Sequence, residues 1–133
     1  MSRSLLVLGW HNIEPTWAFS GTSPEAGRRS FEHQVRLLRR WVHVVPLAGA
    51  LADLAEGRAL PPRAVALTFD DGYLDNATFA APLLAEAGLP ATFFLVPDFL
   101  SGTADAWWER LGQAFAEATA PEVRWEGERF DTS

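Results

Sequence analysis

The sequence contains no cysteine and no long apolar run, and each of these absences excludes some classes of site or segment. It also contains no lysine, from which no function follows. Without cysteine, a disulfide framework and a thiolate zinc site are excluded, so any metal must be held by carboxylate, imidazole, carbonyl or water ligands. The first apolar run, residues 5–8, is too short for the core of a signal peptide or for a membrane span. We therefore expect no membrane span and a cytoplasmic location, with a mature cell-envelope or secreted form as the alternative.

Length and charge give a second set of bounds. With 133 residues, 48% of them apolar, the chain is long enough for one domain with its own core. Its net charge of -6 argues against a nucleic-acid partner, which would favour a basic surface. Residues 1–63 carry 8 arginines against 5 acidic residues, whereas residues 64–133 carry 3 against 12. The acidic half is either solvated surface or a field that attracts cations.

Short apolar runs alternate with amphipathic segments, which predicts an α/β fold of parallel strands with flanking helices. The expected strands are residues 5–10, 42–46, 65–69 and 91–97. The first two expected helices are residues 30–41, with Ser30 as N-cap, and residues 47–56, closed by Gly57. The third is capped by Asp75 or Asn76, bends at Pro82 and ends at Gly88. The fourth is capped by Asp105. Residues 123–130 alternate around a glycine, which predicts a small hairpin.

Aromatic residues follow two of the predicted loops. Residues 12–29 are rich in proline and glycine, so we expect a long loop over the strand ends, with Trp17 and Phe19 as anchors. These two rings either pack the loop onto the domain or stack on a sugar. Trp107 and Trp108 either pack under the hairpin or form a sugar platform.

Polar residues stand where the predicted strands end. Asp70 and Asp71 follow the most apolar strand, His11 follows the first strand, and Asp98 follows the strand at residues 91–97. Because ligands of α/β folds bind at the carboxyl ends of parallel strands, these residues are candidates for one site. For His11 a local hydrogen bond at the strand end is an equal alternative, and we expect His33 and His43 to have no chemical role.

The segment Thr68-Phe69-Asp70-Asp71-Gly72-Tyr73 resembles the signature motif of the polysaccharide deacetylase family. The resemblance extends over nearly all of residues 1–133, which it implies form a single deacetylase-like domain. It is carried by further segments in the family's order, namely residues 8–13, 31–47, 60–63 and 88–95. Residues 107–111 with the hairpin are similar to an insertion found in one branch of the family.

The resemblance implies a fold, a reaction and roles for the two aspartates. The fold would be the front part of a distorted (β/α)7 barrel with a helix–hairpin insertion near its C-terminal end. The reaction would be hydrolysis of N- or O-acetyl groups on an acetylated glycan, with Asp70 as general base and Asp71 as ligand of a divalent metal, zinc first. In such a site the metal acidifies a water and the base removes its proton. His11, Tyr73 and Asp98 would line the site.

The sequence also departs from that family. The remaining metal ligands should be a His-x-x-x-His pair after the motif, but His11, His33 and His43 all precede Asp70. We therefore expect the chain to be the N-terminal portion of a deacetylase domain, incomplete at its C-terminus and with negligible activity. If Asp71 alone cannot hold the metal, none will be bound. An exposed sheet edge would then be open to self-association. The alternative is a non-catalytic glycan-binding or interaction module. An aspartate-nucleophile phosphatase would carry Asp-x-Asp, which the adjacent pair lacks.

Overall fold

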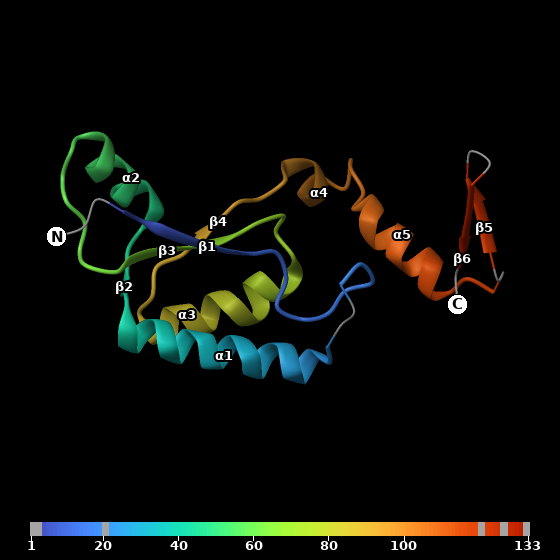
Figure 1. Ribbon diagram of the computed structural model, residues 1–133, viewed down its shortest axis with the longest axis horizontal. Helices are drawn as coiled ribbons and strands as arrows, with labels where there is room; N and C mark the ends of the chain where they lie inside the picture. Colours follow the sequence, from blue (N-terminus) through green and yellow to red (C-terminus); the bar gives the residue numbers. More distant parts are fainter. Residues whose placement is uncertain (1–3, 20–21, 120–121, 126–127, 132–133) are drawn as a thin grey trace.

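The computed structural model describes residues 4–19, 22–119, 122–125 and 128–131, and its elements alternate as the sequence predicts (Figure 1). The strands are β1 (Leu6–Trp10), β2 (His43–Val44), β3 (Ala64–Phe69), β4 (Thr92–Phe93), β5 (Glu122–Trp125) and β6 (Glu128–Asp131). The helices are α1 (Pro24–Trp41), α2 (Leu47–Ala55), the π-helix η1 (Asn76–Ala80), α3 (Ala81–Ala87), α4 (Pro97–Ser101) and α5 (Trp107–Ala116). The α/β class with parallel strands and flanking helices is confirmed.

The strand β3 is the centre of the main sheet. β1 runs parallel along one edge of β3, with Leu6 opposite Val65 and Trp10 opposite Phe69. The other edge is shared, because β2 pairs with the start of β3 and β4 with its end, both in parallel. All six residues of β3 are buried, which is typical of a parallel strand covered on both faces.

The core is formed by aromatic and aliphatic side chains around β3. The ring of Phe69 stacks between Trp10 and Phe93, with ring centroids 5.4 and 4.8 Å apart, and Phe31 of α1 meets Phe69 edge-on at 5.9 Å. Figure 1 shows α1 and α3 side by side along one face of the sheet. A second, smaller cluster of Ala50, Leu60 and Ala64 packs α2 against the start of β3.

The helix α1 begins earlier than the sequence predicted, so the loop at residues 12–29 is shorter. Its N-cap is Ser23, whose side chain accepts the N–H of Ala26, and Pro24 occupies the first turn. Ser30 lies inside the helix. The sequence predicted a loop here partly because of Gly27. In the structure this glycine allows close packing, since a Cβ at Gly27 would lie 2.2 Å from the carbonyl oxygen of Ile13. Gly27 is therefore a helical residue at a close contact and not a loop residue.

The segment after the motif also differs in its first turn. Asp75 stands at the N-cap position of η1, as predicted, but its side chain makes no capping hydrogen bond, and this π-helical turn precedes α3. Pro82 lies within the continuous helical run of η1 and α3, as predicted, and the π-helical turn directly precedes it. Gly88 ends α3 with φ +68°, as predicted.

The predicted strand at residues 91–97 is mostly not a strand. β4 covers only Thr92–Phe93, and Pro97 opens the short helix α4. Asp98 is therefore a residue of a helix and does not follow directly on a strand end. Asp105 is likewise not the N-cap of α5: that position is Ala106, and the Asp105 carboxylate bonds Arg110 at 2.8 Å.

Near the C-terminal end, the predicted hairpin is confirmed. β5 and β6 pair antiparallel, while the turn residues between them lie outside the described residues. Among the described residues Trp108 contacts Phe99 and Tyr73, and Trp107 is exposed. None of the helices in the described part of the chain is both long enough and apolar enough to cross a membrane.

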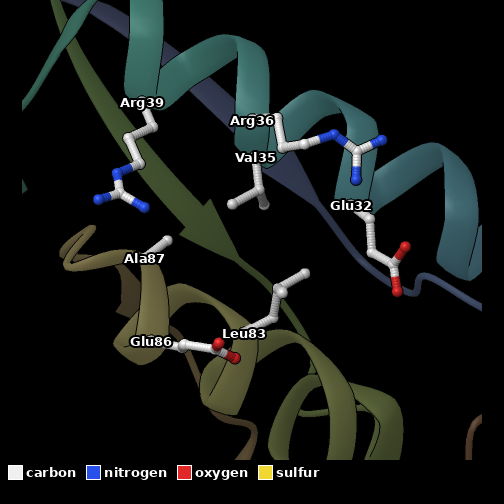
Figure 2. Close-up of a pocket in the computed structure, with 7 residues that line it drawn as sticks. All are labelled: Glu32, Val35, Arg36, Arg39, Leu83, Glu86 and Ala87. Atoms are coloured by element: carbon white, nitrogen blue, oxygen red, sulfur yellow. The ribbon is translucent and has the colours of Figure 1, made fainter.

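The arginine-rich face of α1 borders a shallow cleft of about 230 Å³ between α1 and α3 (Figure 2). Arg36 and Arg39 line it together with Glu32 and Glu86, around the apolar Val35 and Leu83. The cleft thus carries both signs of charge, which fits a solvated surface. It contains no residue of the Asp-Asp-Gly motif.

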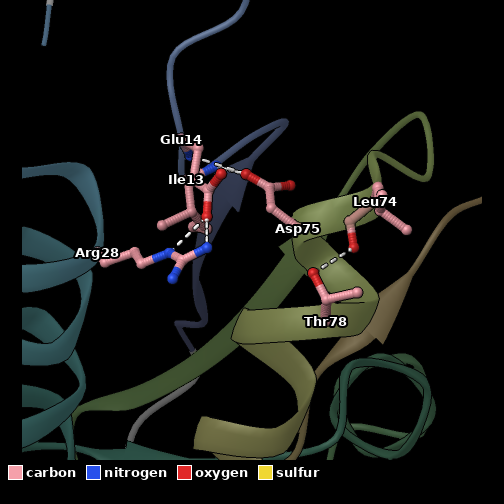
Figure 3. A network of polar contacts seen from close by, with 6 residues as sticks. All are labelled: Ile13, Glu14, Arg28, Leu74, Asp75 and Thr78. Carbon is pink, nitrogen blue, oxygen red and sulfur yellow. Dashed lines mark hydrogen bonds and ion pairs between the residues drawn. The ribbon is translucent and has the colours of Figure 1, made fainter. Parts of the chain in front are cut away.

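A buried carboxylate joins the segment after β3 to the loop after β1 (Figure 3). Oδ2 of Asp75 accepts the backbone N–H groups of Ile13, at 2.6 Å, and of Glu14, at 2.7 Å. Asp75 is only 9% exposed, so water does not readily replace it as the partner of these two donors. The side chain of Glu14 continues the network to Arg28 of α1.

We predict that Asp75→Ala lowers the free energy of unfolding by about 2–4 kcal/mol, because it leaves two backbone donors without a partner. Urea unfolding followed by far-ultraviolet circular dichroism measures this loss. The matched control is Asp105→Ala, which removes only an exposed ion pair and should cost at most about 1 kcal/mol. Equal losses in the two variants would contradict the bracing role of Asp75.

Candidate active site

The carboxyl ends of β1 and β3 meet at one edge of the sheet, and they bring three of the predicted site residues together. Trp10 and Phe69 are register partners, and the N–H of Asp70 donates to the carbonyl of Trp10 at 2.9 Å. His11 and Asp70 are thus the first residues beyond two adjacent parallel strands. This is the placement that the sequence predicted.

The chain leaves β3 through two consecutive residues in the left-handed region. Asp71 has φ +68° and Gly72 has φ +72°. Asp is one of the few side chains that tolerate this conformation, and glycine adopts it freely. A Cβ at Gly72 would in addition lie 2.9 Å from Cδ2 of Leu95, so that exposed side chain would have to move. The turn therefore requires Gly72 and fixes the direction in which the Asp71 carboxylate leaves the strand.

That direction brings Asp71 to His11. Nε2 of His11 lies 3.8 Å from Oδ2 of Asp71, and the side chains are 58% and 27% exposed. Neither side chain has another hydrogen-bonding or ionic partner among the described residues, and the carboxylate of Asp70 has none. All three groups are open to a ligand.

Asp98 is not joined to this group by any contact within the described part of the chain. It is exposed on α4, and its carbonyl oxygen accepts the N–H groups of Thr103 and Ala104. The neighbouring Phe99, and not Asp98, lines the pocket beside Asp71.

Tyr73 lies at the centre of a hydrogen-bonded group. Its hydroxyl donates to Oε1 of Glu109 at 2.8 Å and accepts from Nε1 of Trp108 at 2.8 Å. Burial is the main cause that raises the pKa of Tyr73 from 10.0 to about 12, and the charges of Glu109 and Asp71 act in the same direction. The phenol therefore stays protonated throughout the physiological pH range.

Glu109 is the residue of this region that the sequence did not reveal. Its Oε2 accepts the N–H of Ala18 at 3.1 Å. Burial, the largest single effect, would raise the pKa of Glu109, but hydrogen bonds from Ala18, Thr16, Tyr73 and Trp17 together hold that pKa below its usual value. A single glutamate in an amphipathic helix gives no sequence signal, because its partners are 36 and 91 residues away.

A pocket of about 270 Å³ opens beside Asp71. Its lining comes from the motif, from α4 and from α5, and consists of Asp71, Gly72, Tyr73, Phe99, Ala104, Ala106 and Trp108. Phe99 and Trp108 meet edge-on with centroids 5.7 Å apart. The pocket thus combines one carboxylate with three aromatic side chains, a lining that suits a ring with both apolar and hydroxyl groups.

The described residues alone do not fit a catalytic metal. Such an ion takes three protein ligands, and no group of three or more His, Asp or Glu side chains with that geometry exists within the described ranges. Asp71, with His11 close by, supplies at most two donors.

The raised pKa of Tyr73 can be tested directly, because Tyr73 is the only tyrosine of the chain. We predict that the 295 nm absorbance of the folded protein shows little tyrosinate at pH 10, where tyrosine in the urea-unfolded chain is about half ionised. Glu109→Gln should move the folded titration to lower pH by removing the neighbouring negative charge. Glu117→Gln, which removes an exposed charge beyond the end of α5, should not. A folded titration near pH 10 in the unaltered protein would contradict the burial of the phenol beside the Glu109 carboxylate.

Comparison with known proteins links this arrangement to one family. The polysaccharide deacetylase family profile matches residues 57–120, which include the motif. YxkH of Bacillus subtilis, whose name assigns it to polysaccharide deacetylases, is 31% identical over 98 residues, covering 69% of this chain and 32% of its own length. The poly-β-1,6-N-acetyl-D-glucosamine N-deacetylase of Escherichia coli K12 is 30% identical over 106 residues, covering 77% of this chain and 15% of its own.

Solved structures agree with the fold. IcaB from Ammonifex degensii is 35% identical with a TM-score of 0.57, covering 68% of this chain and 37% of its own. The deacetylase PplD of Streptococcus pyogenes has a TM-score of 0.60 at 18% identity, covering 82% of this chain and 51% of its own, and supports the fold alone. The chain thus spans about a third or less of the curated relatives that it matches. The motif, the fold and these relatives together make the chain a member of the polysaccharide deacetylase family, over the part of the family fold that it spans.

Proposed function

We propose that this chain carries the carboxylate side of a polysaccharide deacetylase site, and that the reaction is hydrolysis of an acetyl group on a glycan. The observation that carries the proposal is the placement of Asp70 and Asp71 at the end of the buried strand β3, beside His11, within the segment that matches the family. Both carboxylates are accessible, as a reacting pair must be.

Asp70 is proposed as the general base. Its carboxylate has no hydrogen-bond partner among the described residues, so it is free to accept a proton. It would take that proton from a water as the water oxygen forms a bond to the acetyl carbon. The bond from that carbon to the sugar nitrogen or oxygen then breaks, acetate leaves, and the proton passes to the departing group.

Asp71 is proposed as a ligand of a divalent metal, with zinc as the first candidate. Its left-handed backbone turns its carboxylate away from the strand direction and towards His11. Because the described donors fall short of three, no step of the reaction is assigned to the metal. For the same reason we propose that the chain by itself has negligible turnover.

The proposed substrate is an acetylated polysaccharide. The Escherichia coli relative is named for poly-β-1,6-N-acetyl-D-glucosamine, which supports a polymer of N-acetylated hexosamine. The aromatic pocket beside Asp71 supports the same class, since sugar rings bind aromatic side chains through their apolar faces. We also propose a cytoplasmic location and self-association through the edge of β1 that pairs with no strand of the described residues, where Leu6 and Val7 are exposed.

A second candidate function is glycan binding without hydrolysis. The observation that favours it is the lack of a three-donor cluster in the described part of the chain. A binding module would need the aromatic pocket but neither carboxylate. The two candidates therefore differ in what happens when the aspartates are replaced.

We predict that Asp71→Ala weakens Zn²⁺ binding at least about tenfold, since even residues behind a metal ligand cost 10–100-fold when replaced. Asp70→Asn should bind Zn²⁺ as the unaltered protein does. Isothermal titration calorimetry with Zn²⁺ alone measures both, and His33→Ala is the control for adventitious binding to an exposed imidazole. If Asp71→Ala binds Zn²⁺ as tightly as the unaltered protein, the ligand assignment fails.

We also predict that the unaltered chain releases acetate from an N-acetylglucosamine oligomer no faster than a Zn²⁺ blank. The reason is the missing third donor, without which the cation is held too weakly to activate water. An enzyme-coupled acetate assay measures the rate. Acetate release that depends on Asp70 would refute the requirement for further donors, and release that persists in Asp70→Asn would refute the base assignment.

A further inference from the structure

The helix α5 contacts both loops of the candidate site. Its residue Glu109 uses one carboxylate oxygen for the hydroxyl of Tyr73, two residues after Asp71, and the other for the N–H of Ala18 in the loop after β1. One side chain therefore joins two segments that are 55 residues apart in the chain, as the difference between positions 73 and 18 shows.

The backbone of α5 makes the same connection by close packing. Gly112 lies one turn beyond Glu109, and a Cβ at that position would be 2.6 Å from the carbonyl group of Trp17 and 2.8 Å from the N of Ala18. The loop at residues 16–18 therefore rests directly on the helix. Because only glycine permits this approach, Glu109 comes within reach of the loop's N–H groups.

Trp108 completes the group from the pocket side. Its Nε1 donates to the Tyr73 hydroxyl, while its ring lines the pocket beside Asp71 and meets Phe99 edge-on. The Tyr73 hydroxyl thus has one donor and one acceptor, both from α5. Tyr73 forms one wall of that pocket, so the position of the wall depends on α5.

We propose that Glu109 is a positioning residue, which holds the Tyr73 wall of the pocket against Asp71 by tying it to the loop at residues 16–18. It acts on the glycan through Tyr73 and does not take part in the chemical step. The proposal deepens the proposed function and rests on it where it concerns the glycan. The hydrogen-bonded connection itself stands without it.

A spectroscopic test follows from the single tyrosine. With the whole chain labelled with [4-¹³C]tyrosine and ¹⁵N, the ring carbon of Tyr73 gives one NMR signal, and amide exchange reports on Ala18. Glu109→Ala should shift the tyrosine signal and speed exchange at Ala18 about tenfold, the effect of one lost hydrogen bond of about 1.4 kcal/mol. Glu109→Gln should leave the tyrosine signal close to its original position, because the amide oxygen of glutamine still accepts a hydrogen bond from the phenol O–H.

The control is Glu117→Ala, which removes an exposed carboxylate that Gln113 contacts at the end of α5 and should move neither signal. The binding readout is the Kd of a β-1,6-linked N-acetylglucosamine disaccharide, measured by calorimetry well below the melting temperature. Glu109→Ala should weaken this binding about fivefold to tenfold, with partial rescue in Glu109→Gln.

The outcomes separate the two proposals. If Glu109→Ala lowers only the melting temperature, with the tyrosine signal, the Ala18 exchange and the Kd unchanged, Glu109 is merely structural and the positioning role is overturned. If both NMR signals respond while the unaltered protein does not bind the disaccharide, the connection stands and the proposed glycan substrate fails. Where Glu109→Ala does not fold, Tyr73→Phe replaces it and should weaken binding without unfolding the chain.

Discussion

Burial of β3 on both faces is the constraint on which the rest of the structure depends. Every residue from Ala64 to Phe69 is buried, so the register of β1 along this strand cannot slip without exposing apolar side chains. The polar residues that follow each strand are then forced to the same edge of the sheet.

Two carboxylates outside the reacting pair brace this edge from different sides. Asp75 ties the segment after the motif to the backbone at Ile13 and Glu14, and Glu109 ties Tyr73 to the backbone at Ala18. Both use charged acceptors for backbone donors, which gives stronger bonds than neutral pairs. The loop after β1 is thus held at two points against the loop after β3, and His11 precedes both points in the chain.

The regular part of this architecture was predictable from sequence, and the contacts between distant segments were not. The apolar run at β3, the closing Gly57 and Gly88, and the hairpin each have a local pattern, and each was found. At Gly27 the local pattern predicts a loop, because it cannot show that Ile13 packs against this residue. At Asp75 the local pattern predicts a side-chain cap, whereas the carboxylate binds backbone groups 62 and 61 residues away. At the site, the ends of the predicted strands indicated that Asp70, Asp71 and His11 share one edge of the sheet, while Glu109 carried no signal.

We propose that the turn after β3 presents Asp71, with His11 beside it, as the metal-binding side of the site. An anomalous diffraction map of crystals grown with Zn²⁺ tests this proposal most directly. We expect a peak within coordination distance of the Asp71 carboxylate, on the side facing Nε2 of His11, and its loss in Asp71→Ala crystals. A peak confined to His33 or His43, with none at Asp71, would contradict the claim.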